Sequence, residues 1–138
     1  MLMMWLLENI SFYIDSLSVF FLVIIAAVSI PALIYSYGYL KRGYSPLRLF
    51  TIHAGTVLFI VTMVGVVCSS NLFLFLFAWE CMSLISYFLV VFDHEKPSSV
   101  NAGLIYLIAT HVGTAFILAA LLIMYHYSGS FDFMAVRC

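Results

Sequence analysis

The chain has 138 residues, of which 66% are hydrophobic and 8% charged, and its formal net charge is -1. Soluble domains are close to half apolar and a quarter charged, so this composition excludes an ordinary soluble domain and predicts an integral membrane protein. The slight negative charge gives no reason to expect a nucleic acid partner. The three cysteines are scattered without a C-x-x-C spacing, so neither a disulfide framework nor a zinc site is predicted.

Four long apolar segments follow one another, at about residues 15–37, 50–69, 71–92 and 99–127. Each holds the roughly 20 apolar residues that a membrane-spanning helix requires. The alternation with a period of two residues that marks a membrane β-barrel is missing, which favours helices. The sequence therefore predicts an all-α fold, an integral membrane bundle of four transmembrane helices.

The loops predict how these helices cross the membrane. Loop 38–49 carries basic residues and no acid: Lys41, Arg42 and Arg48. Loops rich in Lys and Arg stay on the cytoplasmic side, so loop 38–49 is expected there. Loop 93–98 then returns to the cytoplasm. The expected division is an extracytoplasmic N-terminal segment 1–14, a transmembrane domain 15–127 and an extracytoplasmic tail 128–138.

The sequence also predicts where the helices begin. Asp15 is suited to the N-terminus of the first helix, where a negative charge is favourable. Asn71 is the expected N-cap of the third helix. Pro97 is expected to open the fourth helix, because proline is well tolerated in the first turn.

One ionisable residue, Glu80, lies almost at the centre of the third segment. A charged residue at the bilayer centre costs roughly 2.5–3.5 kcal/mol on insertion scales, and such residues are usually functional. Ser83 and Tyr87 follow at i+3 and i+7 and share the same helix face, which gives a polar stripe. A carboxyl group there can take up and release a proton, so Glu80 is a candidate proton carrier. The alternative is a protonated Glu80 that only hydrogen-bonds a neighbouring helix.

The fourth segment holds His111 near its middle, with Thr114 at i+3. An imidazole exchanges protons near neutral pH, so His111 is a candidate relay and Thr114 a candidate part of its polar path. The alternative is a neutral His111 bonded to a backbone carbonyl or a threonine. Ala109 and Gly113 form a small-xxx-small pair, which lets another helix approach closely here and makes a contact with the Glu80 helix sterically easy. In the second segment, His53 is either a point where protons enter or an ordinary interfacial histidine.

No lysine or arginine lies inside a predicted span. Glu80 therefore rests neutral, or its cation belongs to another chain or to sequence beyond this one. The histidines do not pair with a carboxylate at i+4, so no metal site is predicted. No C-x-x-C-H haem attachment occurs, and no glycine-rich phosphate loop, so no cofactor is expected.

The run W-E-C-M-S-L-I-S-Y-F-L-V at 79–90 resembles a helix of the antiporter-like proton-translocating subunits. That family includes the large membrane subunits of respiratory complex I, Mrp antiporters and group 4 hydrogenases. Y-I-D-S-L-S at 13–18 and Y-S-Y-G-Y at 35–39 are similar to the start and the end of an early helix of the family. T-H-V-G-T at 110–114 resembles the hydrogenase branch, which comprises formate hydrogenlyase subunit 3 and hydrogenase-4 component B.

The resemblance implies that Glu80 matches the family's proton-carrying carboxylate, which pairs with a lysine on the next helix but one. It implies that the chain is an N-terminal-half fragment of a subunit without its own redox centre. The expected function is proton translocation coupled to electron transfer in partner subunits. The expected partners are other membrane subunits of a hydrogenase or complex I-like assembly, the lipid bilayer and, indirectly, peripheral redox subunits. The expected location is the inner (plasma) membrane of a bacterium or archaeon.

Two alternatives of a different class stay open. The first is a structural four-helix membrane scaffold, or a fragment without transport activity. The second is a small quinone-linked membrane enzyme, which would need a redox cofactor or a cysteine pair.

Overall fold

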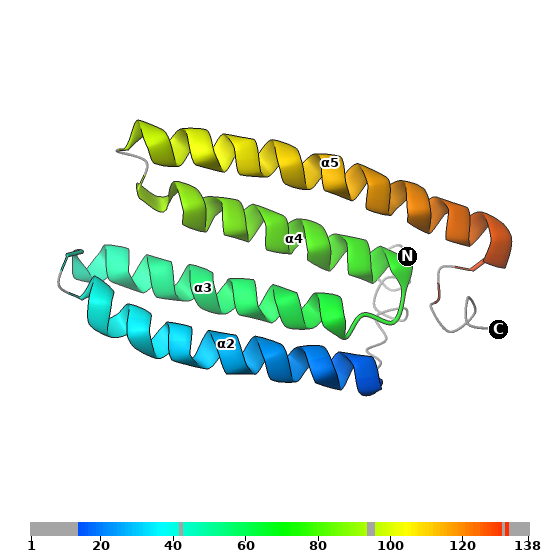
Figure 1. Ribbon diagram of the computed structural model, residues 1–138, viewed down its shortest axis with the longest axis horizontal. Helices are drawn as coiled ribbons and strands as arrows, with labels where there is room; N and C mark the ends of the chain where they lie inside the picture. The colour runs from blue at the N-terminus through cyan, green and yellow to red at the C-terminus, as the bar shows by residue number, and fades with distance from the viewer. Residues whose placement is uncertain (1–13, 42, 94–95, 131, 133–138) are drawn as a thin grey trace, which may run out of the picture.

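The computed structural model describes residues 14–41, 43–93, 96–130 and 132. It contains four long helices, each of which packs against the next one along the chain, with α2 and α5 at the two edges of the row (Figure 1). The elements are α2 (Ser16–Leu40), α3 (Pro46–Val67), α4 (Leu72–Val90), the short 3₁₀ helix η1 (Val91–Asp93) and α5 (Pro97–Ser128). The four long helices have the length and the apolar composition to cross a membrane. The predicted all-α membrane fold is confirmed.

The helix starts follow the predicted caps. The Asp15 side chain accepts a hydrogen bond of 2.7 Å from the Ser18 N–H at the start of α2. Asn71 does the same for α4, accepting from the Leu74 N–H at 2.6 Å. Both side chains satisfy a backbone donor that the first turn of a helix leaves without a partner. The structure also begins α5 at Pro97, as expected.

The start of α3 differs from the expected one. The Ser45 hydroxyl accepts a hydrogen bond of 3.5 Å from the Arg48 N–H, and Pro46 takes the first helical position, where no N–H is needed. The helix therefore starts at Pro46 instead of Phe50, and Arg48 lies in its first turn instead of the loop. The helix before it is also longer than expected, because α2 continues to Leu40. Arg42 lies outside the described residues, as do most of the expected segments 1–14 and 128–138.

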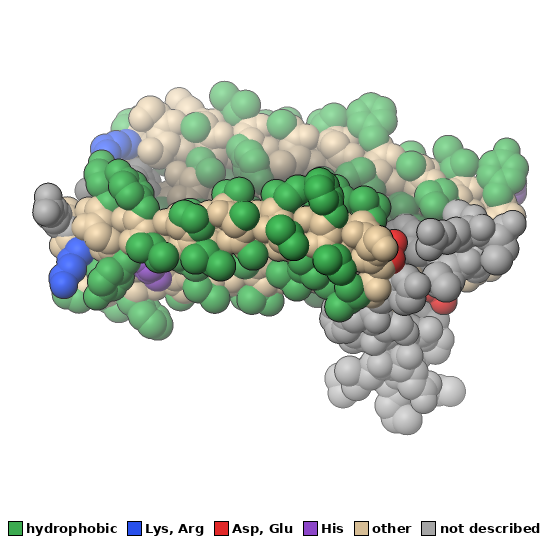
Figure 2. All heavy atoms as spheres, turned by 60° about the horizontal axis from the view of Figure 1, so that its bottom comes forward, with side chains coloured by type: hydrophobic (Ala, Val, Ile, Leu, Met, Phe, Trp, Pro, Cys, Tyr) green, Lys and Arg blue, Asp and Glu red, His purple; other side chains and the backbone are tan. Residues whose placement is uncertain are grey.

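Charged side chains separate toward the two ends of the row. The described basic residues lie at the end where α2 is joined to α3 and α4 to α5: Lys41, Arg48 and Lys96. Asp15 and Asp132 lie at the opposite end, where α2 begins and α5 has ended, whereas Asp93 closes η1 at the basic end. Figure 2 shows a broad hydrophobic surface between the blue and the red ends. This is the charge pattern of a membrane-spanning unit.

Few side chains in the row are buried. The buried residues are Ser18, Ile25, Cys68, Ser70, Leu72, Ala78, Ser83 and Gly103. The outer faces of the helices expose large apolar side chains, such as Phe116 in α5 and Ile34 in α2. In a membrane these faces meet lipid chains or further helices, so little burial within the chain is needed to keep them out of water.

Candidate functional site

Glu80 and His111 face each other across the contact between α4 and α5. The distance from Glu80 Oε2 to His111 Nε2 is 3.8 Å, within the range of an ion pair and longer than a direct hydrogen bond. The Glu80 side chain is 32% exposed and the His111 side chain 51%. The structure therefore brings together the two residues that the sequence singled out on these helices, and it leaves the pair open on one side.

The backbone of α5 determines which nitrogen of His111 carries a hydrogen. Nδ1 lies 2.9 Å from the carbonyl oxygen of Leu107, and a carbonyl can only accept, so Nδ1 is the donor. Nε2 is then bare when the ring is neutral and protonated when it is charged. A bare Nε2 and an ionised Glu80 would repel each other, because both present lone pairs. One proton on either group makes the contact attractive, and the pair then carries no net charge.

The hydroxyl groups near this pair bond to the helix backbone. Ser83 is 2% exposed and donates to the carbonyl of Trp79 at 3.1 Å. Thr114 donates to the carbonyl of Thr110 at 3.1 Å and accepts from the indole N–H of Trp79 at 3.2 Å. Each hydroxyl has one hydrogen, which these bonds already use. Ser83 and Thr114 therefore hold side chains and helices in position, and Trp79 links α4 to α5 directly beside Glu80.

Tyr87 lies at the end of the polar stripe, where its ring packs against Gly103 of α5. A Cβ atom added to Gly103 would lie 3.3 Å from Tyr87 Cε2, and it would overlap with Cγ2 of Val91. Only a glycine fits this position of α5 without a shift of its neighbours. The ring of Tyr87 thus has a packing role between the helices, in addition to the phenol it contributes to the stripe.

The helix of Ala109 and Gly113 does pack against the Glu80 helix, although the small pair itself makes no close contact. A Cβ atom added to Gly113 would meet nothing within 4 Å, and Ala109 is exposed. At this level the two helices are linked instead by the Trp79 side chain, which donates to the Thr114 hydroxyl at 3.2 Å. A pair of small residues permits a close contact but does not require one.

His53 lies between α2 and α3 and makes its contacts there. Its Nε2 is 3.3 Å from the Ser36 hydroxyl oxygen, and its Nδ1 is 2.9 Å from the carbonyl oxygen of Leu49. The ring also packs edge-on against Tyr37, with 5.8 Å between the ring centroids. The structure therefore brings His53 together with Ser36, a residue that the sequence did not single out, and not with Glu80.

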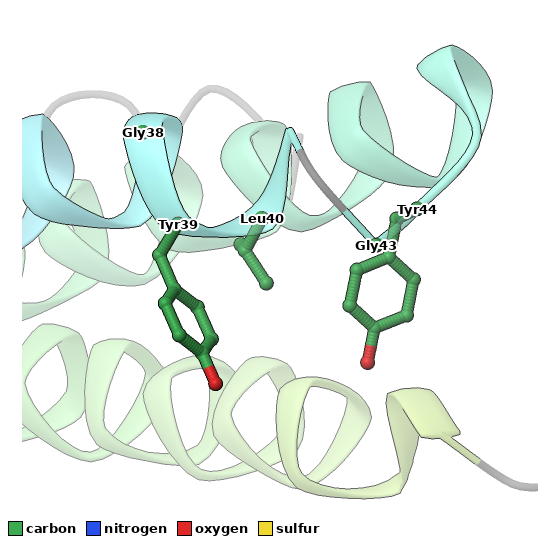
Figure 3. Close-up of a pocket in the computed structure, with 5 residues that line it drawn as sticks. All are labelled: Gly38, Tyr39, Leu40, Gly43 and Tyr44. Carbon is green, nitrogen blue, oxygen red and sulfur yellow. The ribbon is translucent and has the colours of Figure 1, made fainter.

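A cavity of about 430 Å³ opens at the basic end of α2. It is lined by Gly38, Tyr39, Leu40, Gly43 and Tyr44. Figure 3 shows the Tyr39 and Tyr44 rings extending to the same side of the backbone with their hydroxyls pointing the same way. None of the predicted site residues lines it. Across the described ranges, no three His, Cys, Asp or Glu side chains gather as a metal-binding group would.

Four helices long and apolar enough to cross a membrane, with an acid–histidine contact at mid-length, define an integral membrane protein. The family described as "NADH:quinone oxidoreductase/Mrp antiporter, TM" matches residues 69–137, which is half of the chain. A second family, "NADH-Ubiquinone oxidoreductase (complex I), chain 5 N-terminus", matches residues 6–50. The chain belongs to the NADH:quinone oxidoreductase/Mrp antiporter family, which confirms the resemblance read from the sequence.

Individual relatives come from two branches of this family. NAD(P)H-quinone oxidoreductase subunit 5 from the chloroplast of Chara vulgaris is 34% identical over 94% of this chain and 20% of its own length. Hydrogenase-4 component B of Escherichia coli is 35% identical over 89% of this chain and 18% of its own length. The chain thus spans about a fifth of the length of these curated relatives.

Proposed function

We propose that the chain forms part of a membrane subunit that carries protons across the membrane through Glu80, coupled to electron transfer in partner subunits. The observation that supports this most is the contact of 3.8 Å between Glu80 and His111 at the middle of two apolar helices. Acids and histidines at that depth are costly and usually mark proton or ion paths. The names of the relatives point the same way, since both are parts of oxidoreductase or hydrogenase assemblies.

The proposed role of the pair follows from its proton count. With one shared proton the pair is neutral; a second proton leaves it with one positive charge, and loss of the first leaves it with one negative charge. An apolar environment disfavours both the positive and the negative state of the pair. A charged group that moves toward or away from the pair therefore determines which state is populated. In this scheme Glu80 carries the proton and His111 relays it.

The exposed side of the Glu80–His111 pair suits contact with a further membrane helix. Glu80 and His111 remain 32% and 51% exposed, and lipid chains cannot satisfy polar groups. We therefore propose that a further membrane helix covers this side, from the remainder of a longer subunit or from a partner subunit. A lysine on that helix, as the family resemblance implies, would supply the cation that the predicted spans of this chain lack. Peripheral redox subunits would act on the site only indirectly.

The charge distribution supports an orientation. The end that carries Lys41, Arg48 and Lys96 would be cytoplasmic, following the preference of basic loops for that side. The T-H-V-G-T run at 110–114 favours the hydrogenase branch, and with it the plasma membrane of a bacterium or archaeon. The similarity to a chloroplast NAD(P)H-quinone oxidoreductase subunit makes the complex I-like branch the alternative.

The test is the substitution Glu80→Gln in the assembled complex. Glutamine keeps the size and the hydrogen-bonding capacity of the side chain and removes the exchangeable proton. We expect proton translocation, measured with a pH-sensitive dye in sealed vesicles, to be abolished while electron transfer by the peripheral subunits stays measurable.

Glu80→Asp is the matched control, because it keeps the carboxyl group and only shortens the side chain. It should retain part of the translocation. Translocation by Glu80→Gln at the rate of the unmodified complex would contradict the proposal and favour a structural scaffold.

A further inference from the structure

A second histidine lies in a hydrogen-bonded setting between α2 and α3. His53 is in the first half of α3 and Ser36 in the last turns of α2, so both lie toward the basic end of the row. Each residue is partly buried. The Ser36 hydroxyl oxygen is 3.3 Å from His53 Nε2 and 3.0 Å from the carbonyl oxygen of Leu33. His53 Nδ1 is 2.9 Å from the carbonyl oxygen of Leu49.

Counting hydrogens shows that these contacts suit two different states of the ring. The Leu49 carbonyl can only accept, so His53 Nδ1 carries a hydrogen in both states. If the ring is neutral, Nε2 is bare and the single hydrogen of the Ser36 hydroxyl points to it. If the ring is charged, Nε2 donates to the Ser36 oxygen, and the hydroxyl hydrogen turns to the Leu33 carbonyl. The ring therefore has a partner at each nitrogen in either state.

We propose that His53 and Ser36 form a second proton-binding site, in which the serine hydroxyl turns between the histidine ring and the Leu33 carbonyl as the ring loses or gains a proton. The step forms one N–H bond at Nε2 and breaks one O–H bond of a hydronium ion from the aqueous phase at the basic end, which leaves a water molecule; no electrons are transferred. The site uses only α2 and α3. It therefore does not depend on proton transport by Glu80.

The surroundings of His53 fit a site that is charged only part of the time. On α2, the Tyr37 ring packs against His53. The Lys41 ammonium group lies 5.8 Å from the centre of the Tyr37 ring. On α4, the apolar Leu89 packs against Gly55, two residues from His53. Among the described side chains that pack here, Lys41 is the charged group and Tyr37 the titratable one. The positive charge of Lys41, on the far side of Tyr37, disfavours a permanent positive charge on the His53 ring. When the ring does gain a proton, the Ser36 oxygen accepts a hydrogen bond from it and stabilises the charged form.

The proposal can be tested on the full chain in lipid nanodiscs with nitrogen-15-labelled histidine. The ring signals of His53 are identified as those that His53→Gln removes. At the alkaline end of a titration, nuclear magnetic resonance should show a protonated Nδ1 and a bare Nε2, and at the acid end both nitrogens should be protonated. Proton uptake after a pH jump across neutrality should fall by about one proton per chain in His53→Gln, since histidine changes charge in that range.

Two serine variants separate the hydroxyl from the bulk of the side chain. Ser36→Ala should move the Nε2 signal of the neutral ring, because it removes the hydroxyl that donates to that nitrogen, and Ser36→Thr should restore the signal. A neutral ring that carries its hydrogen on Nε2 would overturn the proposal, as would an Nε2 signal unchanged in Ser36→Ala. Glu80→Gln should leave the His53 signals unchanged, so failure of this site and failure of the Glu80 proposal give different results.

Discussion

The α4–α5 pair and the α2–α3 pair each hold a histidine in the same local geometry, with different partners across the helix contact. In both, Nδ1 lies 2.9 Å from the carbonyl oxygen four residues earlier, at Leu107 for His111 and at Leu49 for His53. Both rings therefore direct Nε2 to the neighbouring helix. His111 meets the carboxyl group of Glu80 there, whereas His53 meets the hydroxyl of Ser36.

The partner decides what each histidine can do. A carboxyl group can itself give up its proton, so the Glu80–His111 pair has three protonation states and changes its net charge in both directions. A hydroxyl does not ionise near neutral pH, so the His53–Ser36 pair has only a neutral and a positive state. The comparison separates a site that can pass a proton onward from one that only holds it.

The largest effect on function should appear when His111 is replaced. We expect His111→Leu to lower proton translocation in the assembled complex by about tenfold, equivalent to about 1.4 kcal/mol. Dye measurements in sealed vesicles test it, with His126→Leu in the last turn of α5 as the control. Equal losses in His111→Leu and His126→Leu would remove the special role of the pair.

The next effect concerns the glycines that set the helix distances. Gly103→Ala should lower the free energy of unfolding by about 1–3 kcal/mol, because its Cβ would overlap with the β-branched Val91. Gly55→Ala should cost less, since its Cβ would lie 2.9 Å from the end of the flexible Leu89 side chain. Gly113→Ala, at an open position, should be neutral or stabilising by up to about 1 kcal/mol. Unfolding in mixed detergent–lipid micelles gives the order; a cost at Gly113 as large as that at Gly103 would contradict it.

A smaller effect is expected at the hydrogen bond beside the acid. Trp79→Phe should destabilise the chain by about 1 kcal/mol, as should Thr114→Val, because each removes one side of the bond of 3.2 Å that links α4 to α5. The double variant should cost less than the sum of the two single variants by about 0.6 kcal/mol, the usual coupling for hydrogen bonds between membrane helices. Strictly additive costs would show that the bond does not form in the membrane.

The smallest effect should come from the link between α2 and α3. The Ser18 hydroxyl donates to the carbonyl of Val67 at 3.0 Å. Ser18→Ala should cost about 0.5 kcal/mol, because such bonds contribute little between membrane helices. The exposed Ser16→Ala is the control and should leave the unfolding midpoint where it is. A larger loss of unfolding free energy in Ser18→Ala than in Trp79→Phe would contradict this order, because the α2–α3 bond would then contribute more than the α4–α5 bond.

Much of the fold could be predicted because each membrane helix is defined locally. The length of each apolar segment and the caps at Asp15 and Asn71 are visible in the sequence and do not depend on neighbours. The start of α3 was misplaced for a local reason as well. Ser45 and Pro46 form a strong helix start even though the basic Arg48 follows it, and charge alone had marked that residue as part of a loop.

The site was predicted only in part, because contacts between helices depend on rotation and spacing. Glu80 and His111 stand out in the sequence as polar residues in apolar helices, and each could be chosen without knowing the other's position. Ser36 and Trp79 could not be chosen in the same way. A serine near a helix end and a tryptophan in an apolar run are both common, and their roles depend on which side chain the next helix presents.

The sequence by itself determined that the chain forms four membrane helices with one acid near the centre of the third, because hydrophobicity along a segment needs no tertiary information. It also determined the family, through the motif around that acid. Only the tertiary structure decided that Glu80 lies 3.8 Å from His111, that Gly103 and not Gly113 is the close contact, and that His53 meets Ser36. These follow from how α4 turns toward α5 and α2 toward α3, and that packing is fixed by the shapes of side chains far apart in the sequence.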